Sequence, residues 1–203
     1  MCYSPEASAF AFIANTISSY VLYKNSIPSE QFLGVFFAYI GGVQLYDWIL
    51  WKNQGGDVNI VVTKLQMFHV LCEPVVLSGL IYSYTGNLGI RSAISTSIYT
   101  INAGIYIYKK LLEPEYTQVI KSEEGKDELI WNWNNRKDGV LTNSLFVLSF
   151  AMLGYENLVY PKNILFTTFL LGSLSFSVLF KNQIGRYWCK IGSFAPWLFL
   201  YRS

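Results

Sequence analysis

The chain has 203 residues, of which 52% are apolar and only 14% are charged. Soluble domains carry about 25% charged residues, so this composition excludes an ordinary soluble domain and predicts a multi-pass protein whose main partner is the lipid bilayer. The formal net charge of +2 comes from scattered basic residues, which gives no basic stripe for nucleic acid.

Membrane-spanning helices need about 20 predominantly apolar residues. Seven segments meet this requirement: residues 5–23, 30–51, 59–84, 89–110, 139–158, 161–181 and 185–201. The sequence therefore predicts an all-α fold, an integral membrane bundle of seven transmembrane helices formed as one domain by residues 1–203.

The first segment begins with a clear helix-start signal. Ser4 suits the N-cap position, Pro5 the first helical position, and Glu6 the positive end of the helix dipole. We therefore expect Ser4 and Glu6 to start the first span at the membrane surface, with Cys2 at headgroup level.

The connection between the fourth and fifth spans differs from the short turns elsewhere. Residues 111–138 are polar, and two strand-like runs, YTQVIKS and DELIWNW, flank the turn EEGK. We predict a small cytoplasmic β-hairpin insertion, with Trp131 and Trp133 on one face resting on the lipid headgroups. A partly ordered loop is the alternative.

The distribution of basic residues sets the expected orientation. With seven spans, the N-terminus, the hairpin and two further loops share one side. That side collects Lys52, Lys64, Lys109, Lys110, Lys121, Lys126, Arg136, Lys137, Lys181, Arg186 and Lys190, against Lys24, Arg91, Lys162 and Arg202 on the other. We expect the N-terminus and hairpin to be cytoplasmic and the C-terminus to lie outside.

Ionisable residues inside the predicted spans are the main functional candidates, because each is costly in the hydrocarbon layer. Helical spacing and depth bring a set of them into the cytoplasmic half of the bundle. The predicted cluster consists of Asp47, His69, Glu73 and Lys190, surrounded by Gln44, Gln66 and Asn102. Pro74 directly follows Glu73 and is expected to kink that helix.

The fourth segment carries a continuous polar face. Ser92, Ser95, Tyr99, Asn102 and Tyr106 repeat at alternating spacings of three and four residues. We expect Ser92, Ser95, Tyr99 and Tyr106 to line a route that leads away from the cluster.

Two functions of different classes follow from this pattern. The first is a channel or transporter for an ion, proton or small polar solute, in which Glu73 is the midplane proton site and His69 its titrating partner. The second is a structural or assembly protein of a membrane, such as a viral envelope, in which the polar network only holds helices together. A homo-oligomer fits either function.

Other chemistries have less support. No cofactor is predicted, although Asp47, His69 and Glu73 offer a weak alternative as metal ligands. A retinal protein would use Lys190, which lies near the start of its helix rather than at the middle. An enzyme is a distant third, because the chain has a single His and its cysteines show no CxxC spacing.

The two ends of the chain resemble an uncharacterised family of small seven-helix membrane proteins of bacteria and large DNA viruses. The opening MCYSPEAS, with Cys2 and Ser4, resembles the family's Met-Cys-aromatic-Ser start. The late GRYWCK, with Trp188 and Cys189, is similar to its closing Trp-Cys element, while QLYDW and HVLCEP are similar more loosely to its second and third spans. The resemblance leaves out residues 111–138, and it implies the fold but no chemistry.

Overall fold

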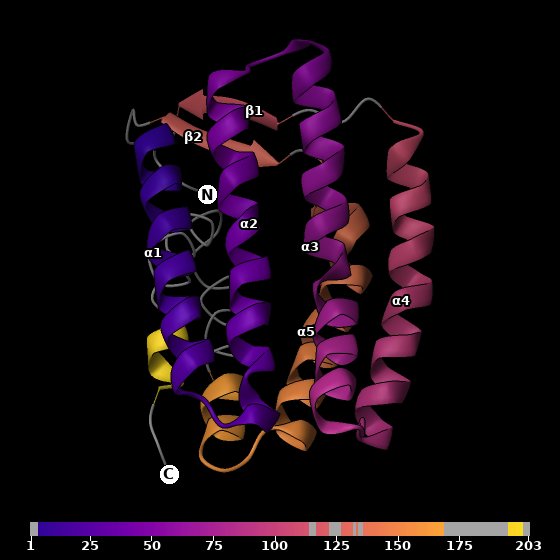
Figure 1. Cartoon of the computed structure of the whole chain (residues 1–203). Coiled ribbons are helices and arrows are strands. Elements are labelled where there is room, and N and C mark those ends of the chain that lie inside the picture. The colour runs from indigo at the N-terminus through magenta and orange to yellow at the C-terminus, as the bar shows by residue number, and fades with distance from the viewer. Residues whose placement is uncertain are drawn as a thin grey trace.

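Long antiparallel helices dominate the computed structural model, which describes residues 4–113, 117–121, 127–131, 133, 136–168 and 195–200. The helices are α1 (Pro5–Asn25), α2 (Phe32–Lys52), α3 (Gly56–Thr85), α4 (Ile90–Leu111) and α5 (Arg136–Asn157). They run alternately up and down in one bundle (Figure 1). A 3₁₀ helix, η1 (Pro28–Glu30), precedes α2, and residues 162–168 and 195–198 are also helical.

The predicted β-hairpin is confirmed. Strand β1 (Thr117–Lys121) pairs antiparallel with β2 (Asp127–Trp131), and Thr117 lies opposite Trp131 in the register. The hairpin lies at the end of the bundle where α1 begins and α2 passes into α3, which we call the hairpin end (Figure 1). Residues 195–198 lie towards the other end, which we call the far end.

The start of α1 is also as predicted. Ser4 is the N-cap, and its Oγ accepts a hydrogen bond from the Ala7 N–H at 3.1 Å. Pro5 and Glu6 occupy the first turn. Helix α3 ends at Gly86, whose φ of 71° is a left-handed conformation that glycine adopts without steric cost.

The buried apolar side chains form two separate clusters within the bundle. The far-end cluster is rich in phenylalanine and contains Phe32, Phe36, Phe37, Phe150, Phe166 and Phe199. The hairpin-end cluster consists of Met67, Leu71, Tyr106 and Trp133. Glu73, on the α3 segment between them, belongs to neither.

Helices α1 and α2 approach each other through small residues. A Cβ at Gly41 would overlap the side chain of Asn15, and one at Gly34 would come within 2.7 Å of Tyr23. Ser18 and Ser19 of α1 are fully buried in this region. Close backbone contact through small residues is typical of helix pairs in membranes, where packing rather than hydrophobic burial drives association.

The polarity of α4 is the reverse of that in a soluble bundle. Its buried residues include Ser92, Ser95, Thr96, Tyr99 and Lys110, whereas Ile90, Ile94, Ile98, Ile101 and Ile105 are all more than half exposed. Helix α1 behaves alike: its buried residues include Ser8, Asn15, Ser18 and Ser19, and its exposed ones include Phe10, Ile13, Ile17 and Tyr20. Helices in water bury their apolar stripe instead.

Two of the described helices, α2 and α3, are long and apolar enough to cross a membrane by length and composition. Helices α1, α4 and α5 were predicted to span as well, but their interior-facing polar residues lower the mean hydropathy. The predicted spans 161–181 and 185–201 fall mostly outside the described residues. The structure is thus mostly helical with a two-stranded sheet, and the count of seven spans stays a prediction.

Candidate functional site: buried carboxyl groups beneath the hairpin

Asp47 and Gln66 meet beneath the hairpin, as the predicted cluster requires. The Gln66 Nε2 donates a 2.7 Å hydrogen bond to the Asp47 Oδ1, which joins α2 to α3. The Trp131 indole N–H, from β2, donates to the same oxygen at 3.0 Å. Asp47 is 1% exposed and Gln66 is fully buried, so the hairpin takes part in closing this site.

The two hairpin tryptophans therefore do not rest on the headgroups. Trp131 points into the bundle towards Asp47, and Trp133 is only 2% exposed. Their rings stack with centroids 5.6 Å apart, and the Tyr106 hydroxyl donates to the Trp133 carbonyl. The two residues lie on one face, as predicted. This face packs on the end of the bundle, where Trp131 binds Asp47 and Trp133 joins an apolar cluster.

Helix α3 fixes the hairpin through Asn59 and Thr63. The Asn59 side chain donates to the Thr117 carbonyl at 2.9 Å and accepts from the Thr117 N–H at 3.0 Å, as a neighbouring strand would. The Thr63 hydroxyl donates to the Thr117 Oγ1 at 2.9 Å. Gln54, from the α2–α3 connection, accepts from the Val119 N–H at 2.9 Å. Sequence reasoning missed these residues, although Asn59 and Thr63 at i,i+4 already mark a polar face at the start of α3.

His69 is held against α2 rather than against Asp47 or Glu73. Its Nε2 lies 2.8 Å from the Tyr39 carbonyl, and the Tyr39 hydroxyl donates to the His69 carbonyl at 3.0 Å. The two rings stack with centroids 3.9 Å apart. A Cβ at position 42 would come within 3.0 Å of the imidazole, so the ring fits against α2 because this residue is glycine.

Glu73 differs from Asp47, the other buried carboxyl group of the site, in its surroundings. Its side chain is 7% exposed, and its carboxyl group forms no hydrogen bond or ion pair with another described residue. It lies close enough to Tyr39 and Tyr99 to interact with both electrostatically. A buried carboxylate without a partner is among the costliest arrangements in a protein interior, so this position calls for a functional reason.

Both tyrosines near Glu73 donate their hydroxyl hydrogens to the backbone of α3. Tyr39 binds the His69 carbonyl, and Tyr99 binds the Leu71 carbonyl at 2.6 Å. These carbonyls lie in the turn that precedes Pro74, where the proline ring disturbs the helical hydrogen bonding. The turn that carries Glu73 is thus held from α2 and α4 together, and the hydroxyl hydrogens are not offered to Glu73.

The polar face of α4 points inward as predicted, but its groups are engaged in helix contacts. The Asn102 Oδ1 accepts from Thr142 of α5 at 2.8 Å, away from Asp47. The Ser95 hydroxyl donates to the Ser92 carbonyl at 3.1 Å. Gln44 is buried on α2 and also has a polar partner. The described members of the predicted cluster are therefore separated: Asp47 binds Gln66, while His69, Glu73 and Asn102 each have other surroundings.

Glu156, which sequence reasoning did not select for the site, caps the start of α4. Its carboxylate accepts from the Ser92 N–H at 2.8 Å and from the Arg91 N–H at 3.3 Å. The Ser92 hydroxyl donates to the same carboxylate at 2.8 Å. The Asn157 Oδ1 accepts a further hydrogen bond from the Gly89 N–H at 3.0 Å. The free N–H groups at the start of a helix need acceptors, and Glu156 of α5 supplies them for α4. Ser92 therefore takes part in the contact that holds α4 and α5 together.

Several predicted site residues lie outside the described part of the chain: Cys2, Lys190, Trp188 and Cys189. Within the described ranges, no three His, Cys, Asp or Glu side chains come together as a metal site. Asp47, His69 and Glu73 accordingly do not form the metal-ligand set that their residue types suggested.

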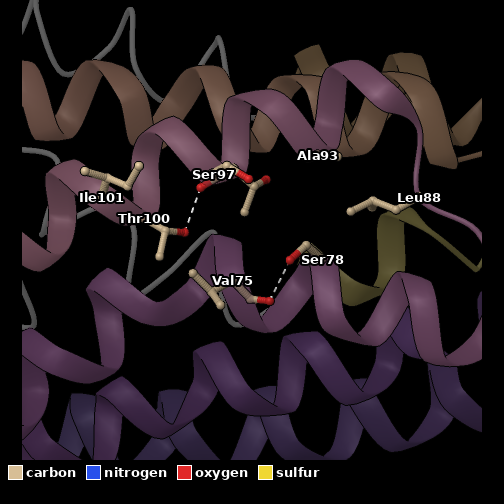
Figure 2. A pocket seen from close by; sticks show the side chains of 8 residues that line it. Val75, Ser78, Leu88, Ala93, Ser97, Thr100 and Ile101 are labelled. Atoms are coloured by element: carbon tan, nitrogen blue, oxygen red, sulfur yellow. Dashed lines mark hydrogen bonds between the residues drawn. The ribbon is translucent and has the colours of Figure 1, made fainter.

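A separate open groove of about 420 Å³ lies between α3 and α4 (Figure 2). Ser78 and Thr100 project at its walls, but each hydroxyl donates to a carbonyl of its own helix, at 2.8 and 2.7 Å. The groove therefore presents mainly apolar surface and belongs to the exterior of the bundle rather than to the buried site.

Comparison with family models, curated proteins and solved structures finds no match to this chain. The resemblance of the chain ends to a family of small membrane proteins rests on the motifs alone.

Proposed function

We propose that the chain is a seven-helix integral membrane protein that moves a proton, an ion or a small polar solute across the bilayer, with Glu73 as the exchange site. The observation that carries the proposal is the buried Glu73 carboxyl group, unpartnered among the described residues, beside a proline in the middle of α3.

The membrane setting is supported by the reversed polarity of the helices. Exposed side chains such as Ile94, Ile98 and Ile101 on α4 would each be unfavourable in water and are favourable against lipid. The interior meanwhile holds hydroxyl, amide and carboxyl groups. A bilayer is the solvent that makes this distribution stable.

Lysine–aromatic pairs fit the two membrane surfaces. At the hairpin end the Lys52 Nζ lies 4.5 Å from the Trp48 ring centroid, and at the end of α1 the Lys24 Nζ lies 5.7 Å from that of Tyr20. Such pairs are typical of the headgroup region. Lys64 and Lys110 also lie at the hairpin end, which supports a cytoplasmic hairpin and N-terminus.

In the proposed mechanism Glu73 alternates between a neutral protonated form and a carboxylate that holds a cation. The cost of an isolated charge at this depth favours the neutral or paired form at rest, and release towards one surface resets the site. His69 and Asp47 lie towards the hairpin end from Glu73, on the route that the transported species would follow.

Flux in proteoliposomes tests this assignment. Purified protein is reconstituted with an internal pH dye, and proton or cation flux is driven by an imposed gradient. We expect Glu73→Gln to lower the flux at least tenfold, because the amide neither binds nor releases a proton. The control is Glu113→Gln, an exposed carboxyl group at the end of α4. Unchanged flux in Glu73→Gln with an intact fold would refute the proposal.

A structural membrane protein is the second candidate, and one observation favours it. Several buried polar groups already bind across helices, as Asn102 binds Thr142 and Thr96 binds Ser149 at 2.8 Å. In that case the wild type shows no flux above empty liposomes, and Glu73→Gln stabilises the fold by relieving a buried charge.

A further inference from the structure

We propose that the β-hairpin is a lid that closes the hairpin end of the bundle, and that the bond from Trp131 to Asp47 holds it shut. This inference rests on the proposed transport function, because it assigns the regulation of that route. The hairpin is built from β1 and β2, and both strands contribute contacts to the bundle end.

The closing contacts combine polar bonds with an apolar anchor, because Leu129 of β2 is 1% exposed and Trp133 is 2% exposed in the hairpin-end cluster. Asn59 makes the paired bonds to Thr117, Thr63 adds its hydroxyl, and Gln54 binds Val119. The Trp131 bond to Asp47 adds a charged acceptor when Asp47 is ionised. Water can replace each of these bonds, so the burial of Leu129 and Trp133 is the main cost of lifting the strands.

The closed state also leaves buried polar atoms without partners. Three buried polar atoms form no hydrogen bond with the described residues: the Gln66 Oε1, the Trp133 Nε1 and the Trp51 Nε1. Trp51 lies one helical turn beyond Asp47. Each such group costs free energy that hydration recovers. Lifting the hairpin wets this region, and the recovered hydration offsets the bonds that are lost. This recovered hydration lowers the free-energy cost of opening, which also exposes Leu129 and Trp133.

Opening exposes a recognition site of defined chemistry. With Trp131 withdrawn, the Asp47 carboxylate and the unused Gln66 carbonyl face water together. Both are acceptors, so the site selects a cation or a solute that donates hydrogen bonds. In the closed state the Trp131 indole N–H takes the place of that solute.

A reversible disulfide between the hairpin and α3 tests the lid. Thr63 and Thr117 have their hydroxyl oxygens 2.9 Å apart, so Thr63→Cys with Thr117→Cys places two thiols within reach of each other. The matched control is Thr96→Cys with Ser149→Cys, whose hydroxyl oxygens are 2.8 Å apart between α4 and α5. Wild type receives the same oxidant, and mass spectrometry measures the extent of each cross-link.

We expect oxidation of the Thr63–Thr117 pair to lower flux at least tenfold and reduction to restore it, with flux retained in the oxidised control. Persisting flux through fully cross-linked protein, or equal loss in the control, would overturn the lid.

Hydrogen exchange separates failure of the lid from failure of transport. The Thr117 and Val119 amides are bound only to side chains of Asn59 and Gln54, so lid opening exposes them directly. We expect them to exchange at least tenfold faster than amides within α2, and the cross-link to abolish the difference. Fast exchange without flux in the wild type supports the lid and refutes transport. Exchange as slow as that of α2, unchanged by the cross-link, refutes the lid even if flux is present.

Discussion

Asp47 and Glu73 are both buried carboxyl groups, but their surroundings give them different roles. Asp47 accepts from Gln66 and Trp131 at one oxygen, whereas Glu73 has no partner among the described residues. Asp47 therefore links the hairpin to the bundle, and Glu73 is the group that we propose as the exchange site. At this scale the environment of a carboxyl group, more than its presence, indicates its function.

Glu156 is a carboxyl group with a structural role, because it caps the start of α4, and its removal tests stability rather than transport. We expect Glu156→Ala to lower the free energy of unfolding by about 1–2 kcal/mol, as the loss of a helix cap does. Glu156→Gln should lose less, since one amide oxygen still accepts from the Ser92 N–H. Unfolding in mixed micelles measures both against Glu113→Gln. Wild-type stability in Glu156→Ala would contradict the capping role.

Sequence reasoning selected buried polar residues of α2 and α3 but did not indicate which of them pair. The spacing of Gln66, His69 and Glu73 correctly predicts one polar stripe on α3. Over seven residues such a stripe rises about 10 Å, so its members meet different neighbours. Gln66 binds Asp47, His69 binds Tyr39, and Glu73 interacts electrostatically with Tyr39 and Tyr99. Those partners depend on helix rotation, which a single sequence does not specify.

At the scale of elements, the contact between α1 and α2 depends on the missing side chain of Gly41. Asn15 fills the space that a Cβ would take. We expect Gly41→Ala to lower the free energy of unfolding by about 1–3 kcal/mol through overpacking.

Gly79 of α3 is a matched control for Gly41, because nothing lies within 4 Å of a Cβ built there. We expect Gly79→Ala to be neutral or to stabilise the helix by up to about 1 kcal/mol, since alanine loses less conformational freedom than glycine. The two variants are compared in the same unfolding assay. Equal effects would show that close approach at Gly41 does not matter.

Helix and hairpin positions were predictable because they depend on local sequence. The segment 89–110 corresponds to α4 (Ile90–Leu111), and the hairpin forms where strand-like runs flank EEGK. The direction in which Trp131 and Trp133 point was not predictable in the same way. Alternation assigns both to one face, but the element that covers this face is set by tertiary contacts with Asp47 and Tyr106.

At the scale of the whole molecule, the account depends on the distribution seen in α1 and α4, where many polar side chains are buried and large apolar side chains are exposed. Helix α4 shows it most clearly, with Tyr99 fully buried and Ile101 68% exposed. Composition alone predicts a membrane protein, and this arrangement supports that prediction without deciding it. It also explains why α4 fails a simple hydropathy test, since its interior face is rich in serine, threonine and tyrosine.

Spin labelling of α4 in lipid bilayers tests this claim most directly. Single cysteines at Ile94, Ile98 and Ile101 carry a nitroxide, and Asn87 in the exposed α3–α4 connection is the aqueous control. Collisions with oxygen, which concentrates in lipid, are compared with collisions with a water-soluble nickel chelate. The account predicts high oxygen and low nickel accessibility at the three isoleucine positions, with the reverse at Asn87. Nickel accessibility at those positions equal to that at Asn87 would contradict it.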